Sequence, residues 1–210
     1  MHRGGATCYH PGEPTMPASM TTEDQAQASE GDPVQRSGFD FVATWQALKP
    51  GDASAIRAFW VREGALDNHQ AIDKRLAQVV MIARTSAGDV AGVSTAVALL
   101  QPRFGQPMYY YRAFVGKAWR TTALVRDLMN RSNALLEAYA RERGFPCIGV
   151  LLELENAGFY RALRKPVWWN PRFYYVGMSE RGLEVRAFYF DGARLKSADE
   201  VKGINLPSHV

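Results

Sequence analysis

The sequence predicts one α/β domain, in which a mixed, twisted central sheet carries helices on both faces. Three observations predict this class. Residues 109–144 are typical of a strand, a short polar turn and one long helix. β-Branched residues on both sides of the turn at 86–89 indicate an antiparallel hairpin. The apolar segment 146–155 follows the long helix, so that helix joins two parallel strands in a crossover.

The stretch 109–144 is the clearest of the three. Residues 109–115 are aromatic and apolar without a helical period, as expected of a buried strand. The helix that follows has apolar residues at helical spacing, namely Leu124, Leu128, Leu135 and Tyr139. Gly144 is the expected end of this helix.

The N-terminal part of the domain is predicted to hold one strand and two helices. A first strand is expected within 39–48, followed by a turn at 49–52. Asp52 is a suitable N-cap for a helix over 53–64, which places Ile56, Phe59 and Trp60 on one face. A second helix is expected over 69–76.

The remaining elements are predicted from short apolar runs and turn residues. Strands are expected over 78–84 and 90–100, and a loop over 101–108. After the crossover, Asn156 is a suitable N-cap for a short helix. The last elements are a loop with exposed aromatic residues over 165–171 and a hairpin formed by 172–178 and 183–190.

Both ends of the chain are predicted to lie outside the domain. Residues 1–38 are rich in small, polar and acidic residues, which is typical of a disordered tail. They contain two arginines and five acidic residues, which is a net charge of −3. Because the whole chain has a net charge of +4, the other residues carry a net charge of +7. The domain is expected to fill 39–191, followed by a tail over 192–210. A basic domain suits a polyanionic ligand, although an arginine-rich solvated surface explains the charge equally well.

The composition bounds the class of protein. With 47% hydrophobic and 22% charged residues, the 210-residue chain has the composition of a soluble globular protein. No apolar run is long enough to cross a membrane, and the first residues lack the apolar centre of a signal peptide. Two cysteines and four scattered histidines predict no disulfide framework and no metal site, and they favour a cytoplasmic location. No nucleic-acid motif is visible.

The turn at 116–122 is the strongest candidate for a ligand site. A strand leads there directly into a helix N-terminus, where free backbone amides and the helix dipole meet Lys117 and Arg120. This combination is suited to a phosphate group. An ordinary strand-to-helix turn with capping threonines is the structural alternative.

The order of the elements resembles the GNAT superfamily of acyl-CoA-dependent N-acyltransferases over residues 39–191. Three segments support the resemblance: LKPGDASAIRAFW as the first strand-to-helix entry, GDVAGVSTA as the hairpin, and ENAGFYRAL as the Asn and Phe-Tyr helix. The resemblance implies a GNAT-like fold and acetyl-CoA, or another acyl-CoA, as co-substrate. It implies an amine of a small molecule or protein as acceptor, and it also allows a homodimer.

The resemblance assigns the cofactor to the turn before the long helix. Arg120 matches the first position of the family's pyrophosphate motif, whereas Ala123 and Val125 stand where the family has glycines. Val125 is β-branched and can crowd a phosphate. The implied cofactor-binding residues are the main chain of the fourth strand and the helix start, with Asn156 in addition: Phe114, Val115, Arg120, Thr121, Thr122, Ala123, Leu124, Val125 and Asn156.

The resemblance also assigns catalytic roles. Tyr160 matches the tyrosine that protonates the leaving thiolate, and packing of the short helix is its structural alternative. Glu153 and Glu155 lie at the end of a predicted strand, where either can deprotonate the amine or act as a surface charge. One aromatic set is a candidate lining for an acceptor pocket, and its loop pair Trp168 and Trp169 is the better part of it: Tyr109, Tyr110, Tyr111, Trp168, Trp169, Tyr174 and Tyr175.

A second hypothesis comes from the same residues. Because Ala123 and Val125 depart from the glycine pattern, the chain can also be a GNAT-fold protein without transfer activity. It would then bind a ligand or a partner through its aromatic surface.

Overall fold

The computed structural model describes residues 38–66, 68–155 and 164–206, which belong to one compact unit. The sheet has the strand order β1-β2-β3-β4-β5-β8-β7-β6. β4 and β5 are parallel, whereas the other neighbouring strands are antiparallel. The predicted mixed sheet is therefore confirmed.

The N-terminal part forms four antiparallel strands and two helices. In order along the chain, these are β1 (Phe39–Ala43), α1 (Pro50–Glu63), α2 (His69–Leu76), β2 (Val79–Thr85), β3 (Val90–Gln101) and β4 (Gln106–Val115). α2 has its predicted bounds, and Asn68 caps it by accepting from the amides of Gln70 and Ala71.

The C-terminal part begins with the helical crossover. A 3₁₀ turn, η1 (Lys117–Trp119), leads into α3 (Thr122–Arg143), which ends at Gly144 in the left-handed conformation. The remaining elements are β5 (Gly149–Glu153), β6 (Val167–Trp169), β7 (Arg172–Met178), β8 (Glu184–Tyr189) and α5 (Ala198–Lys202). β7 has its predicted bounds.

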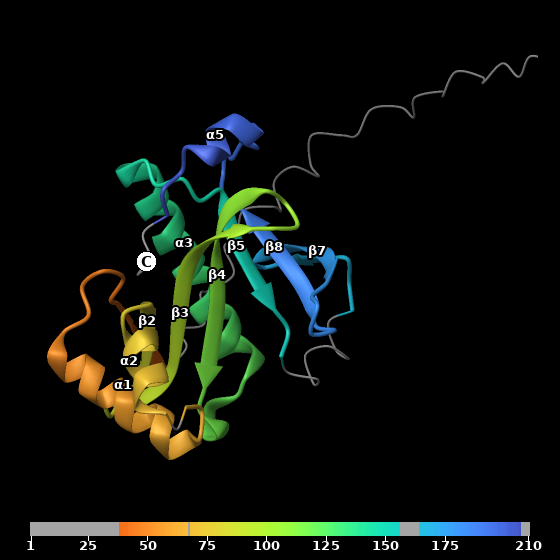
Figure 1. Cartoon of the computed structure of the whole chain (residues 1–210). Coiled ribbons are helices and arrows are strands. Elements are labelled where there is room, and N and C mark those ends of the chain that lie inside the picture. The colour runs from red at the N-terminus through yellow and green to blue at the C-terminus, as the bar shows by residue number, and fades with distance from the viewer. Residues whose placement is uncertain (1–37, 67, 156–163, 207–210) are drawn as a thin grey trace, which may run out of the picture. The chain divides into compact units, whose positions relative to one another are not determined.

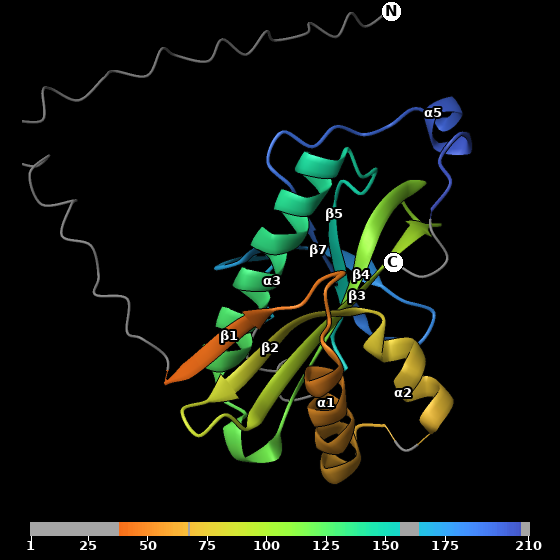
Figure 2. The ribbon, with the colours of Figure 1, turned by 90° about the vertical axis from the view of Figure 1, so that its left-hand side faces the viewer.

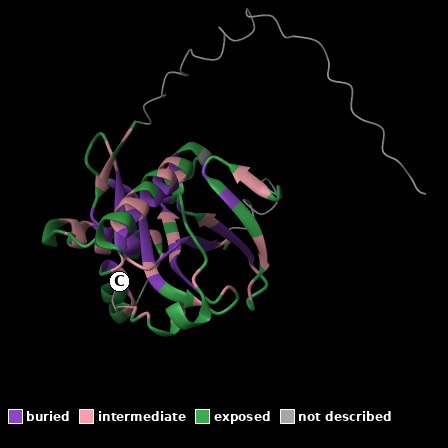
Figure 3. Ribbon diagram, turned by 90° about the horizontal axis from the view of Figure 1, so that it is seen from above, coloured by how far each residue is buried: buried purple, intermediate pink, exposed green. Residues whose placement is uncertain are grey.

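Helices cover both faces of the sheet, as predicted. Ile56, Phe59 and Trp60 of α1 pack with Ile72 and Leu76 of α2 against β2 and β3. Leu124, Leu128 and Leu136 of α3 pack on the opposite face in the largest core cluster. Figure 2 shows α3 on one side of the sheet and α1 and α2 on the other, and Figure 3 shows the buried residues between these layers.

Three local predictions are wrong. Lys49, not Asp52, is the N-cap of α1, because Pro50 occupies the first helical position, where no amide proton is needed. Asp52 lies in the first turn and binds Arg84 at 2.6 Å instead. The predicted loop at 101–108 is largely strand: Gln101 pairs with Gln106, and Gly105 makes the turn with a positive φ of 58°.

The third error concerns the loop predicted over 165–171. Val167–Trp169 forms β6, which pairs with β7, because its aromatic residues pack on the neighbouring strand. Trp168 contacts Phe173 edge to face, with ring centroids 6.2 Å apart. The C-terminal tail also contains a helix, α5, held by a capping box between Ser197 and Glu200. The side chain of Gln106 bonds to the main chain of Lys196 just before it.

Candidate functional site

The site begins where two central strands separate. β4 and β5 pair only at Tyr109 with Val150 and at Tyr110 with Leu151. Beyond these pairs the strands diverge toward their carboxyl ends, as Figure 1 shows at the bottom of the view. Ala113 is therefore exposed although it lies in a central strand. The sheet is open at this place, and its unpaired main-chain groups face the opening.

Strand alternation tells which groups of β4 face the opening. Ile148 donates to the carbonyl of Pro107 on the β5 side, whereas Gly116 donates to Ala91 on the β3 side. Odd-numbered residues of β4 therefore direct their main chain toward β5. Of the two residues predicted from this strand, Val115 presents its carbonyl to the opening. The main chain of Phe114 is on the β3 side, where it pairs with Val93.

A cavity of about 610 Å³ fills the opening, and we call it the central cleft. Residues from β4, the turn, α3, β5 and β6 line it, namely Tyr111, Arg112, Ala113, Phe114, Val115, Arg120, Thr121, Val125, Met129, Leu152, Glu153, Leu154, Glu155 and Trp168. The structure thus brings together the predicted carboxylates and a part of the predicted phosphate turn, although they are about thirty residues apart in sequence.

Arg120 is the cation at the helix end of the cleft. Its Nε donates to the Val115 carbonyl at 3.1 Å, and its guanidinium carbon lies 5.7 Å from the centre of the Phe114 ring. These contacts hold the stem of an exposed side chain. The terminal guanidinium nitrogens are left to interact with an anion.

The amides of the helix start are only partly available. The Thr121 amide donates to Trp119, the Leu124 amide to the Thr121 hydroxyl at 3.2 Å, and the Val125 amide to the Thr121 carbonyl at 3.2 Å. Of the five predicted amides, those of Thr122 and Ala123 remain as the first-turn donors that an α-helix leaves unpaired. A phosphate bound here would meet fewer free amides than a glycine-rich turn provides.

Val125 narrows this end of the cleft. It is half-buried, packs against the main core and also forms part of the cleft wall. Trp119 packs against the same core and lies over Gly116, where a Cβ atom would come within 3.0 Å of its ring. The cleft therefore reaches Arg120 and Thr121 past a valine side chain.

The predicted carboxylates lie on the β5 side of the cleft, at and just after the end of that strand. Arg181, in the turn between β7 and β8, binds Glu153 at 3.2 Å and Glu155 at 3.0 Å. The hydrogen bond to Glu155 and the charges of both carboxylates raise the pKa of Arg181. Glu153 is the less exposed of the two, with 16% of its side chain exposed against 54% for Glu155. Arg181 was not predicted from the sequence, because an arginine in a turn has no distinguishing pattern.

Tyr110 and Arg112 stand beside these carboxylates. The Arg112 guanidinium lies 4.7 Å above the Tyr110 ring. Burial raises the pKa of Tyr110, with a smaller contribution from Glu153 and Glu155, while Arg112 opposes the shift. Burial and the nearby charge of Arg112 lower the pKa of Arg75 in α2. A group of charged residues thus occupies the end of the cleft that faces α2.

Two predicted site residues, Asn156 and Tyr160, lie outside the described residues. The aromatic candidates separate into different surroundings. Tyr109 is fully buried core, whereas Tyr111 and Trp168 line the cleft. Among the described residues, no group of histidine, cysteine and acidic side chains forms a metal site, and no helix is long and apolar enough to span a membrane.

Comparisons with known proteins agree with this architecture. No protein-family model and no curated protein matches the chain. Among solved structures, ribosomal-protein-S5-alanine acetyltransferase from Vibrio fischeri aligns with a TM-score of 0.50 at 9% identity, over 75% of this chain and 96% of its own. The GNAT-family acetyltransferase from Streptococcus pneumoniae aligns with a TM-score of 0.48 at 14% identity, over 72% of this chain and 99% of its own. The structure of yncA from Salmonella typhimurium with its cofactor acetyl-CoA aligns with a TM-score of 0.49 at 15% identity, over 77% of this chain and 99% of its own.

The chain has the fold of the Vibrio fischeri acetyltransferase, with the mixed sheet that the sequence predicted. The two parallel strands, the turn before α3 and α3 itself occur in the order that the sequence predicted. Because these identities are low, the likeness establishes the fold and leaves the chemistry to the residues of the cleft.

The residues present fit an acyl-CoA, although not tightly. An open strand edge can pair with the amide-containing arm, and Arg120 with the α3 N-terminus suits a diphosphate. The bulk of Val125 and the engaged amides reduce the space and the donors for that diphosphate. The α3 end of the cleft is therefore the part that fits a diphosphate.

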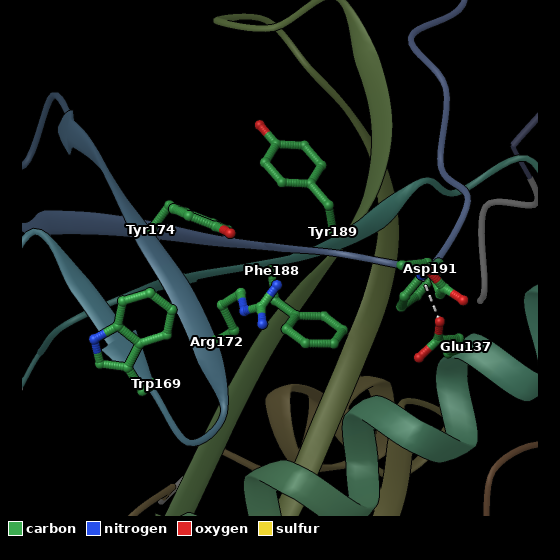
Figure 4. Close-up of a pocket in the computed structure, with 8 residues that line it drawn as sticks. Glu137, Trp169, Arg172, Tyr174, Phe188, Tyr189 and Asp191 are labelled. Carbon is green, nitrogen blue, oxygen red and sulfur yellow. Dashed lines mark hydrogen bonds between the residues drawn. The ribbon is translucent and has the colours of Figure 1, made fainter. Parts of the chain in front are cut away.

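A second hollow of about 650 Å³ lies over the outer strands, and we call it the edge hollow. Glu137, Trp169, Arg172, Tyr174, Phe188, Tyr189, Phe190 and Asp191 line it (Figure 4). Trp169 is 74% exposed, and Arg172 lies 5.7 Å from its ring centre. The two neighbouring tryptophans thus line different cavities. Trp168 lines the central cleft, and Trp169 lines the edge hollow. Of the predicted aromatic residues, Tyr174 also belongs to the edge hollow.

Proposed function

We propose that the protein is an N-acyltransferase, which moves an acetyl or other acyl group from acyl-CoA to an amine of a small molecule or protein. The observation that carries the proposal is the central cleft itself. One cavity joins an open main-chain edge, a cation at a helix N-terminus and a carboxylate pair at a strand end. These are the three parts that direct transfer from a thioester needs.

The donor would lie along β4. The Val115 carbonyl and the other groups that face β5 would pair with the donor's amide-containing arm, and Arg120 would bind the diphosphate. The amides of Thr122 and Ala123 would add hydrogen bonds at the start of α3. The open edge would place the thioester near the end of β5.

The chemical step is a direct displacement. Glu153, directly or through a water, would take a proton from the ammonium, and the free amine would attack the thioester carbon. The carbon–sulfur bond then breaks, and the thiolate leaves with the electron pair and takes up a proton. Tyr160 is the proposed proton donor for the thiolate. Glu153 is preferred to Glu155 as the base because it is more enclosed.

Calorimetry and steady-state kinetics test this function. Acetyl-CoA is expected to bind the full chain with a measurable heat and to raise its melting temperature. Release of free CoA thiol in the presence of amines would then report transfer. Absence of both heat and thermal shift at millimolar acetyl-CoA and at longer acyl-CoA donors would end the proposal.

One observation favours a second function. Val125 stands at the cleft wall, and the amides of Thr121, Leu124 and Val125 are already bonded within the turn. A GNAT-fold protein that no longer binds CoA, but binds another ligand or partner, is therefore the second candidate. It predicts that no acyl-CoA binds the wild-type chain.

A further inference from the structure

The charged end of the central cleft contains a cation that the chain leaves largely unmatched. Arg112 lines the cleft, and its buried Nε has no hydrogen-bond acceptor among the residues that the structure describes. Its Nη2 lies 3.5 Å from the Tyr110 hydroxyl, at the limit of a hydrogen bond. Within the described part of the chain, Arg112 forms no ion pair with a carboxylate. A partly buried guanidinium without a counter-ion is costly, so its position calls for a ligand.

The surroundings of Arg112 increase its need for an anion. Arg75 of α2 lies close enough that burial and then the charge of Arg112 lower its pKa. The carboxylates of Glu153 and Glu155 are near, but Arg181 already binds both of them. Alternation along β4 places Arg112 with Tyr110 and Phe114 on the face that α1 and α2 cover. An anion bound by Arg112 would therefore lie on the face of the sheet opposite α3.

We infer that the acceptor amine carries a carboxylate near its amino group, and that Arg112 binds this carboxylate while Glu153 and Glu155 face the ammonium. The inference rests on the proposed acyl transfer. An amino acid, or a small molecule with the same amino and carboxylate groups, has the two opposite charges that this end of the cleft presents. The planar guanidinium fork of Arg112 matches a carboxylate in two parallel hydrogen bonds.

The test uses the full chain and three matched sets of amines. Each set holds an amino acid, its amide and its decarboxylated amine, taken from L-alanine, L-leucine and L-phenylalanine. Ligand-observed NMR gives the affinity of each compound for the protein, with and without acetyl-CoA. The amide and the decarboxylated amine both lack the carboxylate, but their amines differ in basicity in opposite directions, so a shared loss of affinity reports the carboxylate.

The expected result is that at least one amino acid binds ten times more tightly than both of its comparators, and that Arg112→Gln removes this preference. Arg112→Lys, which keeps the charge without the fork, should restore a part of it. Arg57→Gln is the matched control, since Arg57 is a cation of α1 that binds Asp73 outside the cleft. Melting curves of each variant establish that it is folded.

The inference is overturned if no amino acid binds more tightly than both of its comparators, or if the preference survives in folded Arg112→Gln. Acetyl-CoA calorimetry separates this failure from failure of the proposed function. If only amines that lack a carboxylate were acetylated, the proposed transferase function would stand and the proposed carboxylate-bearing acceptor would be rejected. Arg112-dependent binding of amino acids without any binding of acyl-CoA would keep the ligand class and reject the transferase.

Discussion

The central cleft and the edge hollow have similar volumes, about 610 and 650 Å³, but the backbone makes them in different ways. Beneath the edge hollow the sheet is continuous, with Tyr174 of β7 paired with Ala187 of β8. In the cleft the pairing of β4 and β5 stops after two positions. Only the cleft therefore offers main-chain donors and acceptors together with side chains.

The two regions also differ in how their charged groups are held. In the edge hollow, Glu137 accepts from the amide of Asp191 at 2.6 Å, and Arg172 lies over an exposed indole. Each of these charged groups already has a partner within the surface of the domain. In the cleft, cations and carboxylates come from β4, the turn before α3, β5 and the β7–β8 turn, and they face one space. The comparison teaches that interrupted pairing, rather than size, distinguishes a candidate active site.

The change with the largest expected effect disturbs both regions. Gly149 of β5 pairs with Tyr189 of β8, and a Cβ atom there would lie 2.1 Å from the Phe188 carbonyl oxygen. Gly149→Ala should therefore push β5 from β8 and lower the free energy of unfolding by about 3 kcal/mol. For a domain of this size that is a fall of roughly 6–12 °C in melting temperature, measured by calorimetry.

Gly51→Ala is the control for Gly149→Ala. Gly51 lies in the first turn of α1, where a Cβ atom would meet nothing within 4 Å, so alanine should leave stability equal or slightly higher. Equal melting temperatures for the two variants would show that β5 has room to move, and the close β5–β8 contact would then not define the cleft.

The second prediction separates the cleft from the edge hollow by chemistry. Glu153→Gln keeps the size of the side chain but cannot accept a proton, so kcat for acyl transfer should fall about 100-fold. Glu137→Gln makes the same change in the edge hollow and should leave kcat unaltered, because the amide oxygen can still accept from Asp191. An equal kcat in the wild type and Glu153→Gln would remove Glu153 as the base.

The third prediction uses one arginine from each region. Arg120→Glu should raise the Kd for acetyl-CoA by roughly 10–100-fold, because a charged hydrogen bond to the diphosphate is worth about 1.5–3 kcal/mol. Calorimetry at two salt concentrations should also show a weaker salt dependence in the variant. Arg172→Glu carries the same change of charge in the edge hollow and should leave the Kd near the wild-type value. Similar losses in both variants would indicate a general charge effect.

The sequence predicted the order of the elements because local patterns determine it. The bounds of α2 and β7 follow from a capping residue and a short aromatic run. The edge strand β6 was missed because three residues between prolines carry no period, and only pairing with β7 makes them a strand. The Asp52 error has a similar cause: Asp52 suits an N-cap by residue type, but Pro50 occupies the first helical position and makes Lys49 the N-cap.

Predictions for the site divide in the same way. Five predicted site residues line one cleft, because the order of the strands places the end of β5 beside the end of β4 and the turn that follows it. They are Arg120, Thr121, Val125, Glu153 and Glu155. The places of Arg112 and Arg181 at the cleft were not predicted. Arg181 comes from a distant turn, and the exposure of Ala113 depends on how far β5 diverges. Neither distance nor divergence is encoded in a local pattern.

The smallest expected effect concerns the wall of the cleft beside Arg120. Val125→Ala removes two methyl groups where the diphosphate would lie, and it should lower the Kd for acetyl-CoA about threefold. Some lost packing against the main core is offset by the better helix propensity of alanine, so the melting temperature should change little. Val61→Ala is the control, since Val61 is 55% exposed on α1, and it should leave the Kd unchanged. Tighter binding in Val125→Ala alone would identify the valine as an obstacle to CoA, and binding that appears only in this variant would favour the second candidate function. A rise in Kd would instead mean that the valine contacts the ligand, so the diphosphate would lie elsewhere along the cleft.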